Sequence, residues 1–223
     1  MTNIKLGLQG MPNVKSFMKG FENQIPYATA VGLTRTSKAV QGDLTGKIET
    51  VFDRPTARTK SAVFSASANK RTLRAQVGIK DKAGAGRAPA DYLAAQIIGG
   101  RRKAKGLERA LQSRGLMRKG QMLAPRRDTK LNRYGNISKA QARAVINSVD
   151  SGGAGRGRQY VVKEGQGIYW RKGKGLKGFL NIIDEPTYKS RFDFYGLGAK
   201  SAAKHLPDQL NKAMAEAIRS AKA

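Results

Sequence analysis

The charge imbalance of this chain constrains its fold and its partners more than any other feature of the sequence. Lysine and arginine number 43 against 15 aspartate and glutamate residues, which gives a formal net charge of +28 over 223 residues. Like charge at this density repels itself in a compact monomer, so the folded protein needs a polyanion or an acidic protein surface to face. Nucleic acid is the commonest such partner, because phosphates bind Lys and Arg with release of counterions. The alternative is a basic solvated surface on a virion or ribosome component.

The residues that the chain lacks exclude several classes of protein. Cysteine is absent, which removes disulfides, zinc fingers, iron–sulfur clusters and thiol nucleophiles. The single histidine, His205, does not suffice for the usual transition-metal site, so we expect a surface or packing role. No apolar run reaches the roughly 18 residues that span a bilayer, and the first residues lack a signal-peptide core. We therefore expect a soluble chain made in a cytoplasm, with no metal, no cofactor and no membrane partner.

The remaining candidates for catalysis are weak. Residues 173–178 match the spelling G-x-G-x-x-G, but an apparent strand follows them where the dinucleotide-binding motif needs a helix. Asp184 and Glu185 are adjacent on a predicted strand end and would point to opposite faces. Asp53 and Arg54 precede a proline and are expected to form a turn or a structural ion pair. With one histidine and scattered carboxylates, the sequence predicts a protein that is not an enzyme.

Apolar residues at helical spacing predict long helices near both ends of the chain. Pro26 is expected to break or restart the first of them, because proline lacks an N–H group. From there to residue 51, one face holds Ala30, Leu33, Ser37, Val40, Leu44 and Ile48. The clearest helix covers residues 199–223, and its stripe consists of Ala203, Leu206, Leu210, Ala213, Met214, Ala217 and Ile218. Shorter helices are predicted over 90–98, 107–114 and 139–149, the last capped by Ser138.

Alternating apolar and polar residues predict small antiparallel strands between these helices. Residues 62–66 and 73–79 form the first predicted hairpin, and residues 159–163, 168–171 and 179–183 form a meander; the stretch from 123 to 136 is expected to be irregular. Two Gly-rich basic segments, 81–88 and 151–158, are expected to be flexible loops. The fold class is therefore α+β, a single domain over 1–223 with long helices at both ends around a small antiparallel sheet, and with extended Gly-rich basic loops.

The cations gather in clusters that follow glycine or proline or flank aromatic residues. Such clusters fit phosphate contact with some base stacking, and they fit docking on an acidic protein ring equally well. Tyr169 and Trp170, beside one cluster, are by themselves more typical of sheet core or interface. The candidate binding residues for nucleic acid or an acidic partner are Arg101, Arg102, Lys103, Lys105, Arg126, Arg127, Lys130, Arg133, Arg156, Arg158, Arg171, Lys172, Lys174 and Lys177.

Five short phrases follow one another over roughly residues 20 to 220. They are Gln24-Ile-Pro-Tyr-Ala-Thr-Ala, Val51-Phe-Asp-Arg-Pro-Thr, Tyr92-Leu-Ala-Ala-Gln-Ile-Ile-Gly-Gly-Arg-Arg, Tyr134-Gly-Asn-Ile-Ser and Arg191-Phe-Asp-Phe-Tyr. In order and spacing, these phrases resemble the minor tail protein Z family of tailed phages and prophages. None of them is a catalytic signature.

The resemblance implies a non-enzymatic virion protein of the tail or neck, synthesised in the host cytoplasm, that completes the tail or joins head to tail. It would act as one subunit of a homo-oligomeric ring, against phage portal, adaptor or tail-tube proteins and packaged DNA, without a small-molecule substrate. The residues alone leave a second class open, a free nucleic-acid-binding protein such as a ribosome-associated or packaging factor.

Overall fold

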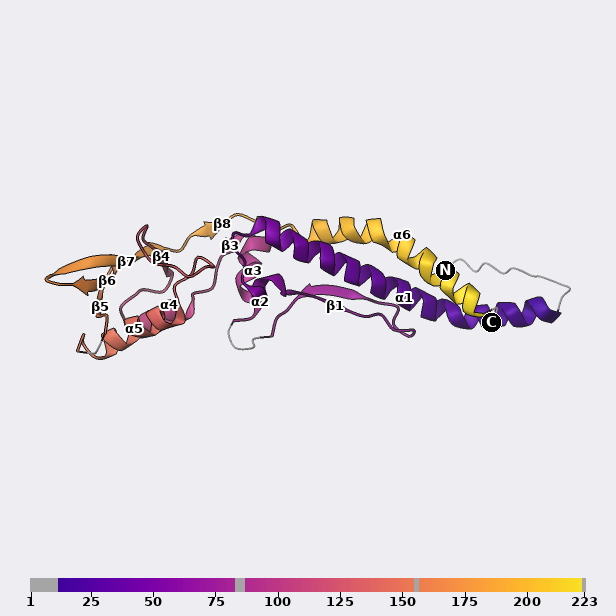
Figure 1. Cartoon of the computed structure of the whole chain (residues 1–223), viewed down its shortest axis with the longest axis horizontal. Coiled ribbons are helices and arrows are strands. Elements are labelled where there is room, and N and C mark those ends of the chain that lie inside the picture. The colour runs from indigo at the N-terminus through magenta and orange to yellow at the C-terminus, as the bar shows by residue number, and fades with distance from the viewer. Residues whose placement is uncertain (1–11, 83–86, 155–156, 222–223) are drawn as a thin grey trace. The chain divides into compact units, whose positions relative to one another are not determined.

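The computed structural model describes residues 12–82, 87–154 and 157–221, and its fold is α+β as predicted (Figure 1). Two long helices, α1 (Pro12–Val51) and α6 (Phe194–Ala221), flank small antiparallel sheets in the sequence. No described helix is long and apolar enough to cross a membrane. Contacts divide the chain into two compact units: unit 1 holds Met1–Lys47, Ser61–Ile79 and Phe194–Ala223, and unit 2 holds Ile48–Lys60 and Lys80–Asp193. This division does not test whether the chain folds as a single domain, which stays a prediction.

In unit 1, α6 runs alongside α1 (Figure 1) and small residues let the two helices approach closely. Ala28 of α1 is buried with Ala213 and Ala217 of α6. A Cβ atom added to Gly32 would lie 2.7 Å from the Leu210 side chain, so glycine at this position sets how near α6 can come. An Arg35–Glu216 ion pair of 2.9 Å joins the same two helices at the surface.

The predicted core face of α1 is confirmed, whereas its predicted break is not. Five of its members are buried, and Leu33 is half-buried; the buried ones are Ala30, Ser37, Val40, Leu44 and Ile48. The helix continues through Pro26, because a proline removes only one bond of the ladder while residues on both sides keep theirs. Helix α6 begins at Phe194 and likewise contains Pro207. Its predicted stripe is right except at Ala203, which is exposed.

The predicted first hairpin is present in unit 1, but it is shorter than expected. Strand β1 (Val63–Ala66) pairs antiparallel with β2 (Gln76–Ile79). Leu73 was predicted to begin the second strand and instead lies in a turn, with a positive φ of 45°. The turn is stabilised by Asn69, whose side chain accepts hydrogen bonds from the N–H groups of Arg71 and Thr72. These side-chain hydrogen bonds compete with strand formation, and the alternation of apolar residues does not reveal them.

Unit 2 is built around a four-stranded antiparallel sheet with the order β4-β7-β6-β5. The three predicted meander strands are present, and the fourth was missed because its residues were expected to be irregular. Helices α4 (Gly106–Gln112) and α5 (Lys139–Asp150) bury Leu111 and Val145 together with the sheet residues Ile168 and Leu180. The strands are β4 (Gln121–Pro125), β5 (Tyr160–Lys163), β6 (Gly167–Lys172) and β7 (Gly175–Asp184).

The other elements of unit 2 are short. Helix α5 begins as predicted, because Ser138 and Gln141 form a capping box in which each side chain accepts from the other's backbone N–H. The helices are α2 (Ala57–Lys60), α3 (Pro89–Ile97), α4 (Gly106–Gln112) and α5 (Lys139–Asp150). A second small sheet pairs β3 (Gly100–Arg101) with β8 (Thr187–Tyr188).

The Gly-rich loops are only partly described, so their predicted flexibility stays a prediction. Residues 83–86 of the first loop, and 155–156 of the second with the candidate Arg156, lie outside the described residues. The G-x-G-x-x-G spelling at 173–178 is not a nucleotide loop, since it forms the turn between β6 and β7 and the start of β7, with no helix after it.

Candidate polyanion-binding surface

The first predicted basic cluster is largely neutralised by acidic partners. Arg101 lies 3.2 Å from Glu185, Arg102 2.6 Å from Glu108, and Lys103 2.6 Å from Asp91. Three of its four cations are therefore committed to partners within unit 2. Sequence neighbours alone could not reveal this, because each acid lies in another element or several residues away.

The Arg102–Glu108 pair is the most buried of these contacts. The Glu108 side chain is 1% exposed and that of Arg102 is 15% exposed. Both carboxylate oxygens accept from the guanidinium, and they also accept from the backbone N–H groups of Lys105 and Leu123. Burial alone would raise the pKa of Glu108, but these hydrogen bonds outweigh it and hold the pKa below its ordinary value. The contact ties the start of α4 to β4.

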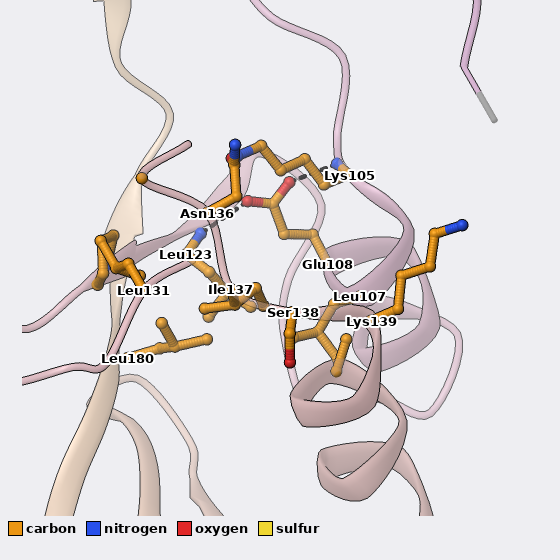
Figure 2. Close-up of a pocket in the computed structure, with 13 residues that line it drawn as sticks. Lys105, Leu107, Glu108, Leu123, Leu131, Asn136, Ile137, Ser138, Lys139 and Leu180 are labelled. Carbon is orange, nitrogen blue, oxygen red and sulfur yellow. Dashed lines mark hydrogen bonds between the residues drawn. The ribbon is translucent and has the colours of Figure 1, made fainter. Parts of the chain in front are cut away.

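A cavity of about 200 Å³ lies next to this ion pair, lined mainly by apolar side chains. Figure 2 shows Leu131, Ile137 and Leu180 around it, with the Glu108 carboxylate turned toward Lys105 and Leu123. The Lys105 side chain extends across the cavity toward Asn136 (Figure 2). Desolvation, followed by the nearby charge of Arg102, lowers the pKa of Lys105. Both oxygens of Glu108 are already occupied by N–H donors, so this carboxylate serves the contact between α4 and β4.

Six of the predicted residues lie around the hairpin formed by β6 and β7: Arg126, Arg158, Arg171, Lys172, Lys174 and Lys177. Strand β5 pairs with β6 only as far as Trp170, and β4 pairs with β7 only as far as Leu180. Beyond them, β6 and β7 continue together to the turn, with Arg171 opposite Leu176 and Lys172 opposite Gly175. Every residue from 171 to 177 is exposed. We call residues 171–177 the basic ribbon; it contains Arg171, Lys172, Lys174 and Lys177.

Tyr169, just before the basic ribbon, is covered by two cations. The Arg126 guanidinium lies 4.9 Å from the ring centroid and donates to the Tyr169 hydroxyl at 3.0 Å. The Lys163 ammonium lies 5.4 Å from the same centroid. Arg126 passes over Gly178, where a Cβ atom would collide with it. The predicted residue Arg126 is therefore held on the sheet surface by cation–π and hydrogen-bond contacts.

Trp170 on the neighbouring position is covered in the same way. Arg158 lies 4.3 Å from its ring centroid, while the other side of Trp170 packs against the apolar core of unit 2. Lys177, opposite Trp170 in the strand register, approaches Asp128 only to 3.8 Å. The two aromatic residues thus act as platforms for cations, and the prediction that they belong to the sheet is confirmed.

Three further predicted residues, Arg127, Lys130 and Arg133, are exposed and lie in the segment after β4. Arg127 and Lys130 make no ion pair with any residue that the structure describes. Arg133 lies over the ring of Tyr134 at 4.8 Å. The structure therefore places Arg126, Arg158 and the four cations of the basic ribbon together at one end of the sheet, and it places the cluster at 101–105 among acids.

Sequence reasoning missed a polar cluster in unit 1 that joins α1 to α6. Asp43 accepts from Ser201 Oγ at 2.6 Å and lies 3.0 Å from His205 Nε2. The Ser201 hydrogen bond and then that of His205 lower the pKa of Asp43. Ser201 and His205 of α6 thus share one acceptor, the Asp43 carboxylate of α1. His205 therefore has the packing role expected, here as a helix-to-helix contact.

Four of the five phrases that carry the resemblance meet in unit 2. Phe192 is 0% exposed and its ring packs edge-on against Phe52 at 5.9 Å between centroids. The backbone N–H groups of Arg191 and Phe192 both donate to the Gln96 carbonyl at 2.9 Å. A Cβ atom on Gly135 would lie 3.4 Å from the Arg54 guanidinium, which also pairs with Asp53 at 2.9 Å as predicted. Segments far apart in the sequence thus form one packed structural cluster.

Within the described residues, no group of three His, Cys, Asp or Glu side chains is placed to hold a metal ion. No protein-family model, no curated protein and no solved structure matches the chain.

Proposed function

We propose that this chain is a non-enzymatic structural protein of a tailed-phage virion, which completes the tail or joins head to tail as one subunit of a homo-oligomeric ring. In this role its basic surface faces packaged DNA or the acidic surface of portal, adaptor or tail-tube proteins. The chain reaches the virion tail or neck after synthesis in the host cytoplasm.

The observation that carries the proposal is the convergence of the resemblance-bearing phrases. Phe52, Gln96, Gly135 and Phe192 come from four separate phrases and lie in one tightly packed cluster of unit 2. The cluster contains the buried ring of Phe192 against the half-buried ring of Phe52, backbone hydrogen bonds and one exposed ion pair. Ring packing and backbone hydrogen bonds are contacts that maintain a fold. A likeness at such positions supports a shared scaffold, and the scaffold implied is that of a tail protein.

The charge distribution supports a partner that is a large anion. Acids neutralise the cluster at 101–105, whereas among the described residues the basic ribbon has one acidic partner, Asp128, at 3.8 Å. An excess of positive charge on a surface is stabilised by binding to a negatively charged neighbour. A virion neck supplies one in its DNA and in acidic ring proteins.

The test is deletion of the gene from a phage that encodes the chain, followed by electron microscopy of the lysate. We expect heads and tails to accumulate separately, and a plasmid copy of the gene to restore joined particles. Joined, infectious particles in the absence of the gene would refute the proposal.

The basic ribbon also favours a second candidate, a free nucleic-acid-binding protein. Such a protein binds DNA as a monomer with an affinity that falls steeply with salt, and it is absent from purified virions. Mass photometry of the protein with and without DNA separates the two, because the proposed virion role requires a ring.

A further inference from the structure

The basic ribbon has a geometry that few cationic loops have. The pairing of β6 with β5 stops at Trp170, and that of β7 with β4 stops at Leu180, so among the described strands residues 172–176 pair only across the hairpin. Gly173 takes a positive φ of 58° and makes the turn narrow, and no heavy atom lies within 4 Å of a Cβ built there. A two-stranded ribbon of this kind is one of the few protein shapes that the major groove of B-DNA admits.

The charge of the basic ribbon is not compensated within unit 2. Lys177 and Asp128 are 3.8 Å apart with side chains 43% and 67% exposed, a geometry that contributes little stabilisation. Other acids of unit 2 are bound to cations away from the ribbon: Asp91 to Lys103, Glu108 to Arg102, Asp150 to Arg114 and Glu185 to Arg101. The cations of the ribbon are therefore available to an external anion.

The side chains on and beside the basic ribbon argue against two other modes of binding, base stacking and protein docking. Base stacking on single-stranded nucleic acid needs an open ring face, but Arg126 and Lys163 lie over Tyr169 and Arg158 lies over Trp170. Docking of a protein needs apolar or aromatic anchors that become buried at the centre of the interface, and the ribbon offers Leu176 alone. What remains is contact with phosphates.

We propose that the basic ribbon is a sequence-independent contact for the phosphate backbone of duplex DNA, seated in or across the major groove. Arg171, Lys172, Lys174 and Lys177 contact the phosphates. Arg126 and Arg158, fixed over the rings of Tyr169 and Trp170, add to the positive electrostatic potential around these four residues. The inference deepens the proposed function, on which its biological setting rests, by naming DNA and not an acidic protein as the partner of this surface.

The experiment measures binding of the full chain to a fluorescein-labelled 30-base-pair duplex by anisotropy over a range of salt concentrations. In the ribbon variant, the four ribbon cations are replaced by glutamine: R171Q, K172Q, K174Q and K177Q. The slope of log affinity against log salt should become shallower by about 3 to 4, since each lost phosphate contact removes about 0.9. Affinity at low salt should fall about tenfold or more, and two duplexes of unrelated sequence should give equal affinities.

The matched control removes the same charge from exposed positions of unit 1: K38Q, R71Q, R74Q and K200Q. We expect the control to keep the wild-type slope to within about one. Equal losses in the two variants would mean that only net charge matters and would overturn the inference. So would an unchanged slope in the ribbon variant, a preference for single strands over the duplex, or ribbon-dependent binding to polyglutamate with none to DNA.

The outcome for the ribbon is separable from that for the proposed function. A ring in the virion together with unchanged DNA binding by the ribbon variant would retain the structural role and remove the DNA contact. Ribbon-dependent DNA binding by a chain that is absent from virions would retain the DNA contact and remove the structural role.

Discussion

Replacing Glu108 by glutamine tests whether the buried ion pair holds unit 2 together. Glu108 accepts four N–H donors with its two oxygens, two from Arg102 and one each from the backbones of Lys105 and Leu123. An amide keeps the volume but turns one oxygen into an NH₂ group that faces donors. It also leaves the Arg102 guanidinium, 15% exposed, without its counter-charge.

The expected loss is large for a substitution that changes so few atoms. Removing one partner of a buried pair costs about 3 to 5 kcal/mol. For a chain of this size, each kcal/mol lowers Tm by about 2 to 4 °C, so the Tm of E108Q should fall by about 6 to 20 °C. Circular dichroism during thermal and urea unfolding measures this change.

The control is D91N, which breaks the neighbouring Lys103–Asp91 pair. The two ion pairs have the same N–O distance, 2.6 Å, but Lys103 is 72% exposed. An exposed pair contributes about 0 to 1 kcal/mol, so D91N should unfold within a few degrees of the wild type. Similar decreases in Tm for E108Q and D91N would refute this prediction, because burial would then not determine how much each ion pair stabilises the protein.

Two further predictions concern single contacts. G167A should lose about 1 to 3 kcal/mol in urea unfolding, because Gly167 has a φ of 154° and a Cβ atom there would collide with the Leu180 carbonyl; wild-type stability would contradict this close approach of β7 to Gly167. D43N should unfold within about 1 kcal/mol of the wild type, and the difference should shrink as the pH falls. The lowered pKa of Asp43 means that its bonds to Ser201 and His205 stabilise the fold above its ordinary value of 3.8 and are lost as the pH drops through the folded pKa; a difference that grows in acid would rule this out.

The sequence predicted those elements whose causes are local. Helix α5 begins after Ser138 because the cap and Gln141 are three residues apart, a spacing that is visible in the sequence. The core face of α1 follows from the spacing of its apolar residues, and the meander strands follow from alternation. The Asp53–Arg54 ion pair was predictable because the two residues are adjacent.

Elements that depend on tertiary contacts were missed. Strand β4 has little alternation of its own and forms because β7 offers a long edge for it. Pro26 was expected to break α1, yet the helix continues through it, and Ala28, two residues further on, is buried against α6. Leu73 follows the alternation of a strand, but the side chain of Asn69 holds it in a turn.

The candidate site was predictable as a set of residue types and not as an arrangement. Charge and spacing alone treated Arg102 and Lys172 alike, whereas folding buries the first against Glu108 and leaves the second exposed on the basic ribbon. The basic clusters beside aromatic residues fitted phosphate contact with some base stacking, and only the fold shows that cations already cover the rings of Tyr169 and Trp170. Partners distant in the sequence decide both outcomes.

The most direct test of the proposed role is cryo-electron microscopy of phage particles purified from a strain that encodes this chain. The proposal predicts a symmetric ring of the chain between a capsid vertex and the tail, with the basic ribbon directed toward DNA. A chain found on RNA, or as a lone monomer on DNA with no copy in the particle, would contradict it.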